Sequence, residues 1–139
     1  SFAVMVPDFP VETSKSRGVL PDIVTRKDAI FNSSRAGLLV GSMMTGNIDN
    51  LKMAMEDRLH QPYRVPLVPG MEQIFEKADE FGAKASYLSG AGPTLVSVLM
   101  DEDRDAFEER MQAYFDTIPH RWTVEVLKPD LEGARIVSE

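Results

Sequence analysis

A glycine-rich turn between two short apolar segments limits most strongly what this chain can fold into. Residues 85–89 and 94–100 have the length and apolar character of strands, and Gly90-Ala91-Gly92-Pro93 stands between them. Glycine and proline at these positions are typical of a tight turn. Strands joined by so short a turn pair antiparallel. The chain is therefore expected to contain an antiparallel sheet built around this hairpin.

The elements expected on either side of the hairpin define the fold class. An apolar run at residues 2–6 and another at 121–127 predict two further strands. Helical spacing and capping residues predict helices at 13–20, 25–45, 49–59, 69–81 and 101–115. This order is an extended β-α-β-β-α-β pattern. We therefore predict an α+β, ferredoxin-like fold, an antiparallel four-stranded sheet with helices packed on one face.

Length and composition exclude several classes of protein. The 139 residues suit one domain, so we expect a single domain over residues 1–139. The net charge of −7 argues against general binding to a phosphate backbone, and the lack of cysteine excludes disulfides and thiolate metal sites. No apolar run approaches the roughly 18 residues of a membrane span, and a cytoplasmic location is expected. The sequence begins with Ser1 inside a strand, which suggests a fragment of a longer protein.

The turn itself is the first candidate site. Gly90 and Gly92 leave the backbone without side chains, so that amide groups can form a concave nest for phosphate or carboxylate oxygens. Thr94 adds a hydroxyl group. A hairpin turn that binds nothing is the other interpretation. The stretch lacks the Gly-Lys-Ser/Thr ending of a Walker loop.

Two further groups of residues suit an anionic small molecule. Thr13 and Arg17 are four residues apart, on one face of the first predicted helix, and a hydroxyl with a guanidinium suits a carboxylate. The other group is the polar stretch 57–64, where Pro62 is expected to end a helix and place Tyr63 and Arg64 in irregular backbone. Capping and surface ion pairs are the alternatives for both groups. His60 has no partner at metal-ligand spacing, and no metal site is predicted.

The methionines fall at helical spacing among other apolar residues. We expect them to fill the core rather than to form a binding surface. Met43, Met44, Met53, Met55, Met71 and Met111 are the ones concerned.

These motifs, in this order, resemble the GHMP family of small-molecule kinases. The stretch from Ser89 to Thr94 is similar to the third, glycine-rich motif of that family. The spacing of Thr13 and Arg17, and the stretch from Asp57 to Arg64 followed by Pro69-Gly70, resemble the homoserine kinases within it. The resemblance extends from Phe2 to about Leu127.

The resemblance implies a function and a set of site residues. The family enzyme transfers the γ-phosphoryl group of Mg-ATP to the side-chain hydroxyl of L-homoserine, a step of threonine biosynthesis. By the family pattern, Thr13, Arg17 and Arg64 hold the substrate, and Gly90, Ala91 and Gly92 lie near the phosphates. No catalytic or metal-binding residue is implied in this chain, because the family's ATP- and Mg2+-binding groups belong to an N-terminal domain.

The chain therefore resembles a C-terminal, substrate-side domain, which is expected to be inactive alone. Its expected partners are L-homoserine and the N-terminal ATP-binding domain of the same enzyme, while neither nucleic acid nor a membrane is expected. The sequence leaves open whether the chain forms a homodimer. The alternatives are the C-terminal domain of another GHMP kinase, or a ferredoxin-like regulatory module that binds an amino acid.

Overall fold

A four-stranded antiparallel sheet forms the centre of the computed structural model, which describes residues 1–136. The strands are β1 (Phe2–Pro7), β2 (Ala85–Leu88), β3 (Leu95–Val98) and β4 (Trp122–Leu127). They lie in the order β2-β3-β1-β4, and all three pairings are antiparallel. This order is that of the β-α-β-β-α-β motif, so the predicted fold class is confirmed.

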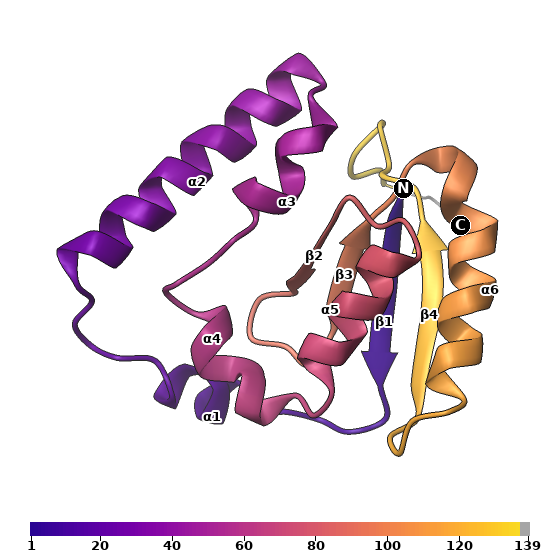
Figure 1. Cartoon of the computed structure of the whole chain (residues 1–139), viewed down its shortest axis with the longest axis horizontal. Coiled ribbons are helices and arrows are strands. Elements are labelled where there is room, and N and C mark those ends of the chain that lie inside the picture. The colour runs from indigo at the N-terminus through magenta and orange to yellow at the C-terminus, as the bar shows by residue number, and fades with distance from the viewer. Residues whose placement is uncertain (137–139) are drawn as a thin grey trace.

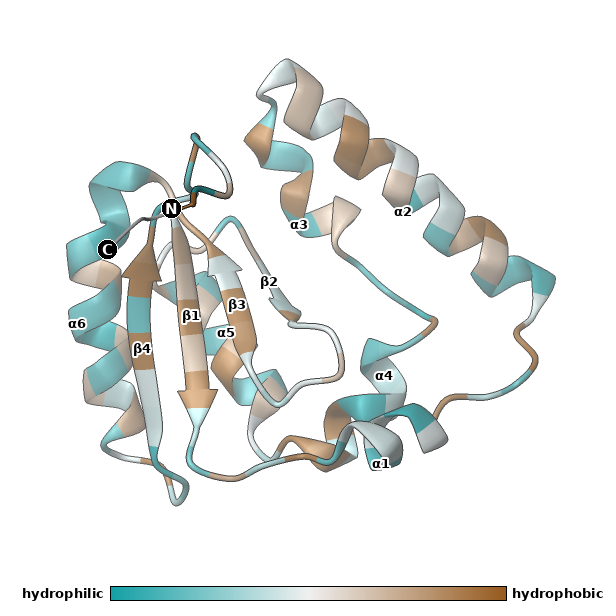
Figure 2. Ribbon diagram, turned by 180° about the vertical axis from the view of Figure 1, so that it is seen from behind, coloured by the Kyte–Doolittle hydropathy of each residue, from teal (hydrophilic) through white to brown (hydrophobic). Residues whose placement is uncertain are grey.

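Two helices cover one face of the sheet and close the core. They are α5 (Met71–Glu80) and α6 (Arg104–Phe115), which follows the short turn η3 (Asp101–Asp103) (Figure 1). Side chains from both helices and from the facing side of the strands are fully buried, among them Met5, Ile74, Leu95, Phe107 and Trp122. The opposite face of the sheet has no helix over it in the described part of the chain (Figure 2).

The long helix α2 (Arg26–Thr45) stands apart from the sheet, beyond β2 (Figure 1). The Thr25 hydroxyl accepts a hydrogen bond from the Asp28 amide at its start, and Gly46 ends it with a φ of 69°. The turn η1 (Ile48–Asn50) and helix α3 (Leu51–Ala54) follow and pack against α2. Within residues 1–136, no helix has both the length and the apolar character needed to cross a membrane.

The outer face of α2 corrects the expectation that the methionines fill the core. Met71 and Met111 are buried as predicted, but Met43 is 62% exposed and Met44 is 83% exposed. Met53 on α3 is also exposed. The contacts of α2 are with α3 and η1, and its apolar residues Ile30, Val40, Met43 and Met44 are exposed; Figure 2 shows the apolar segments along the helix.

Two short helices lie at the end of the molecule where β1 and β2 stop (Figure 1). They are α1 (Thr13–Gly18) and α4 (Gln61–Arg64), which the turn η2 (Val65–Leu67) follows. The prediction that Pro62 ends a helix was wrong: α3 stops at Ala54, and Pro62 lies in the first turn of α4. Proline is tolerated there because its missing N–H has no helical partner to lose.

Candidate functional site

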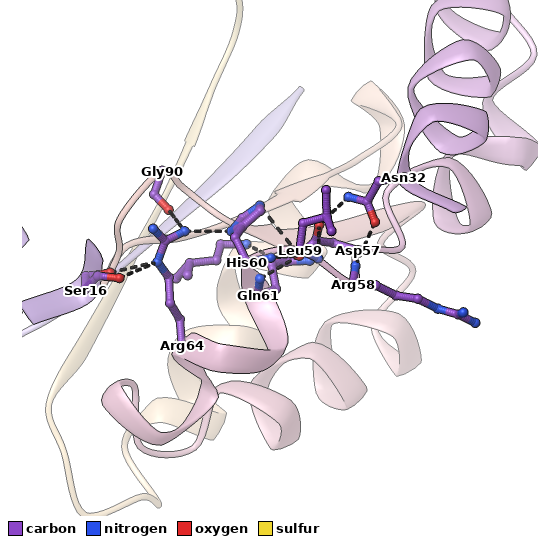
Figure 3. Close-up of polar contacts among 10 residues, drawn as sticks. Ser16, Asn32, Asp57, Arg58, Leu59, His60, Gln61, Arg64 and Gly90 are labelled. Atoms are coloured by element: carbon purple, nitrogen blue, oxygen red, sulfur yellow. Dashed lines mark hydrogen bonds and ion pairs between the residues drawn. The ribbon is translucent and has the colours of Figure 1, made fainter. Parts of the chain in front are cut away.

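Arg64, at the end of α4, is the centre of a set of polar contacts that joins three parts of the fold (Figure 3). Its side chain is buried, with the residue 7% exposed. Nε donates to the Ser16 hydroxyl at 2.8 Å and to the Ser16 carbonyl oxygen at 3.2 Å. Nη1 lies 2.8 Å from His60 Nδ1 and donates a longer bond, 3.4 Å, to the Gly90 carbonyl oxygen. Nη2 makes no hydrogen bond within residues 1–136.

The glycine-rich loop faces this arginine with its carbonyl groups. Ser16 Oγ donates to the Ala91 carbonyl oxygen at 2.6 Å, beside the Gly90 carbonyl that Arg64 reaches. The φ angles of 56° at Gly90 and 81° at Gly92 are positive, which explains glycine at both positions. The Gly92 amide donates to the Ser89 carbonyl oxygen. That amide is used within the loop, so only the amides of Gly90 and Ala91 remain as donors for a phosphate nest.

Asp57 organises the segment that leads into α4. Its side chain, 8% exposed, accepts hydrogen bonds from Asn32 Nδ2 at 2.5 Å and from the amides of Leu59, His60 and Gln61. Burial raises the pKa of the carboxyl group, but these four hydrogen bonds outweigh burial and hold the pKa below its ordinary value. Asp57 is therefore ionised at neutral pH and satisfies the amide groups that precede the helix.

His60 connects Asp57 with Arg64. An arginine nitrogen can only donate, so His60 Nδ1 accepts from Arg64 Nη1, and the proton of the neutral ring is on Nε2. Nε2 lies 3.9 Å from Asp57 Oδ2. Next to it, Gln61 Oε1 accepts from the Leu88 amide at 2.6 Å, which ties α4 to the end of β2. The start of α4 is thus held between α2 and the sheet.

The structure brings some of the predicted site residues together and leaves others apart. Arg64 and the loop of Gly90, Ala91 and Gly92 share one network, through Ser16. Thr13 and Arg17 lie on the same helix as Ser16, but their side chains are exposed. The role of these residues in binding a substrate stays a prediction.

Five members of the network were not predicted as site residues. They are Ser16, Asn32, Asp57, His60 and Gln61. Ser16 carries no signal in the sequence, because serine in a short helix is ordinarily a surface or capping residue. Asp57 and His60 stand within the polar stretch that the sequence did single out.

The electrostatics of Arg64 indicate what the site can bind. No carboxylate of residues 1–136 lies within salt-bridge distance of this buried guanidinium, whose partners are one imidazole, one hydroxyl and carbonyl oxygens. Buried charges are ordinarily paired, and an arginine with an open nitrogen suits a planar anion such as a carboxylate. Within the described part of the chain, no cluster of three or more His, Asp or Glu side chains could hold a metal ion.

One surface cavity lies beside this network, and another lies away from it. The first, of about 330 Å³, is lined by Leu39, Met55, Asp57, His60, Gln61, Tyr87 and Leu88. The other, of about 310 Å³, lies around Trp122 and Ile118, with no lining residue from the network. Neither of these two cavities is lined by Arg64.

Comparison with known sequences identifies close relatives. Residues 34–117 match the family described as GHMP kinases C terminal. A homoserine kinase of Clostridium novyi (strain NT) is 44% identical over 97% of this chain, and one of Caldicellulosiruptor saccharolyticus is 42% identical over 99% of it. In both cases the match covers 45% of the relative, so the chain spans about half the length of the curated relatives that it matches.

Solved structures agree on the fold. The crystal structure of a homoserine kinase from Cytophaga hutchinsonii superimposes with a TM-score of 0.82 at 24% identity, over 89% of this chain and 40% of that one. A putative homoserine kinase from Listeria monocytogenes gives a TM-score of 0.60 at 22% identity, with the same coverage. The match to the family model extends over more than half of the sequence, and the chain belongs to the GHMP kinase family, in its C-terminal domain.

Proposed function

We propose that this chain is the substrate-side domain of a homoserine kinase, which transfers the γ-phosphoryl group of ATP to the side-chain hydroxyl of L-homoserine and gives O-phospho-L-homoserine. The relatives named homoserine kinase, at 41–44% identity over nearly the whole chain, support this assignment. In this proposal Arg64, Thr13 and Arg17 bind the amino acid, and the loop of Gly90 and Ala91 lies near the transferred phosphate.

The observation that carries the proposal is the buried Arg64 guanidinium, which has no carboxylate partner among residues 1–136. The carboxylate of an amino acid supplies the missing charge and accepts from the open Nη2. Such a contact fixes the orientation of the substrate, and positioning is a large part of what a phosphoryl-transfer enzyme contributes. A sugar substrate offers no carboxylate, so this site favours a carboxylate substrate such as an amino acid over a sugar.

A second domain of the same polypeptide belongs to the proposal. More than half of each relative lies outside the matched segment. In this proposal, ATP and a divalent metal bind to that part. Among the residues that the structure describes, no cluster of His, Asp or Glu side chains could hold the metal. The exposed apolar side of α2, with Val40 and Met44, is the surface that we assign to contact with that domain. A cytoplasmic location is part of the same proposal.

The test uses the full polypeptide that carries this chain, in an assay of ADP release with L-homoserine, mevalonate and galactose as separate substrates. Activity is expected with homoserine. Arg64→Met should lower kcat/KM for homoserine about 100-fold, because a hydrogen-bonded charge contact contributes about 1.5–3 kcal/mol. The matched control is Arg121→Met, since Arg121 is exposed. Its kcat/KM should stay within about twofold of the unmodified protein.

The 139-residue chain alone should show no turnover with ATP and homoserine. Turnover by the isolated chain would contradict the assignment of ATP binding to a second domain. Preference for mevalonate or galactose in the full polypeptide would overturn the substrate assignment.

A further inference from the structure

Ser16 is fully buried, although it lies in a six-residue surface helix between residues with exposed side chains. Its hydroxyl group uses both of its hydrogen-bonding roles. Oγ accepts from Arg64 Nε at 2.8 Å and donates to the Ala91 carbonyl oxygen at 2.6 Å. Both bonds span long stretches of sequence, of 48 and 75 residues. A buried hydroxyl with two such partners is a structural joint between distant elements.

The three elements that meet at this hydroxyl are those that the proposed function requires. Helix α1 carries Thr13 and Arg17, helix α4 carries Arg64, and the third element is the glycine-rich loop. The direct bond between Arg64 and the loop is longer, since Arg64 Nη1 reaches the Gly90 oxygen only at 3.4 Å. The Ser16 hydroxyl is therefore the short, well-formed link between the arginine and the loop.

The geometry also determines which arginine nitrogen is available. With Nε bound by Ser16 and Nη1 bound by His60, the plane of the guanidinium is fixed, and Nη2 is the nitrogen that remains for a ligand. Without the hydroxyl, Nε keeps only the 3.2 Å bond to the Ser16 carbonyl oxygen, and the guanidinium can turn about its last side-chain bonds. The direction of Nη2 then varies.

We propose that Ser16 is a positioning residue, which aims Arg64 at the carboxylate of the amino-acid substrate. This inference rests on the proposed function. Ser16 acts through Arg64 and does not touch the substrate. It therefore affects the affinity for the amino acid and leaves the affinity for ATP unchanged.

The experiment is a double-mutant cycle in the full polypeptide, with KM and kcat measured for homoserine and for ATP. Ser16→Ala should raise KM for homoserine about tenfold and change kcat and KM for ATP by less than threefold. Arg64→Lys keeps the charge but loses the fork that Ser16 holds, and should lower kcat/KM about 100-fold. Adding Ser16→Ala to Arg64→Lys should cause less than a further threefold loss, because coupled residues are not additive.

The control is Ser14→Ala on the same helix, where Ser14 is exposed; its kinetics should match the unmodified protein. Additive losses in the cycle, or equal rises of KM for ATP and homoserine, would overturn the positioning role. Ser16→Thr keeps the hydroxyl group, and its KM and kcat for homoserine should stay within threefold of those of the unmodified protein. If Ser16→Ala does not fold, a tenfold loss of kcat/KM for homoserine in a folded Ser16→Thr protein overturns the proposal. An unmodified protein without homoserine kinase activity refutes the proposed function itself, and this inference with it.

Discussion

Replacing Asp57 by alanine is expected to lower the free energy of unfolding by about 3 kcal/mol. The substitution removes the acceptor for Asn32 Nδ2 and for three backbone amides, those of Leu59, His60 and Gln61. A hydrogen bond to a charged group contributes about 1.5–3 kcal/mol, and loss of a capping side chain about 0.5–2 kcal/mol.

The loss of unfolding free energy is not expected to reach the full sum of the four hydrogen bonds. The segment from Asp57 to Gln61 is only half-buried, so water can replace part of what the carboxylate provides. About 3 kcal/mol therefore corresponds to the loss of one charged hydrogen bond and one cap. For a domain of this size, the melting temperature should fall by about 10 °C.

Urea unfolding followed by tryptophan fluorescence measures this change. Trp122 is the only tryptophan, is 1% exposed and stacks on Phe115 with ring centroids 5.7 Å apart. Its emission therefore reports the loss of the core. Asp22→Ala is the matched control, because Asp22 is exposed, and it should change the free energy of unfolding by less than about 0.5 kcal/mol. A loss of less than about 1 kcal/mol for Asp57→Ala would refute the reasoning.

The same carboxylate predicts a pH dependence. The pKa of Asp57 is lower in the folded than in the unfolded chain, because its four hydrogen bonds outweigh the effect of burial. Its stabilisation is therefore present above about pH 4 and is lost as the pH falls through the folded-state pKa. The difference in unfolding free energy between the unmodified chain and Asp57→Asn should shrink as the pH falls from about 4 toward the folded-state pKa. A constant difference over that interval would show that the charge is not what stabilises the segment.

Four further substitutions test the backbone, the core and the outer helix. Gly92→Ala should lower the free energy of unfolding by about 1–2 kcal/mol, because φ is 81° and the new Cβ would meet Leu88 Cδ1 at 2.9 Å. Gly37→Ala in α2 should raise it by about 0.5–1 kcal/mol, because the new Cβ meets nothing within 4 Å and alanine is the better helix former. Both changes are measured by urea unfolding, and equal changes for Gly92→Ala and Gly37→Ala would contradict the reasoning from the backbone angles and the space around each glycine. Phe107→Ala should cost about 3–5 kcal/mol by the same measurement, because the ring is fully buried; a loss below 1 kcal/mol would contradict it. Met44→Gln should leave the unfolding of this chain unchanged and lower the melting temperature of the full polypeptide; no change in either would exclude Met44 from the domain contact.

The sheet and the two helices that cover it could be predicted because their sequence signals are local. A short apolar run and a glycine-rich turn each determine structure within a few residues, and the Thr25 cap does the same for α2. Pro62 was misjudged because proline is compatible with two positions relative to a helix, its end and its first turn. The amide groups bonded to Asp57 favour the second position here, since they hold the chain where α4 begins.

The site could be predicted only where chemistry and spacing coincide. Arg64 and the glycine-rich loop stand out in the sequence, and the structure places them together. Ser16 could not be predicted, because its partners are 48 and 75 residues away and nothing near it in sequence requires a hydroxyl. Met43 and Met44 were misassigned for a related reason: helical spacing shows that a face is apolar, but not whether another element covers it.

The burial of Arg64 has a consequence for the thermodynamics of binding. A mobile arginine side chain has roughly 2 kcal/mol of rotamer entropy, which a ligand would have to remove on binding. Here folding has already removed it, through the bonds to Ser16 and His60. The folded chain in turn holds a cation with reduced hydration and no counter-charge among residues 1–136. Ligand affinity and fold stability are therefore linked: an anion that binds Nη2 also raises the melting temperature of the protein that holds it.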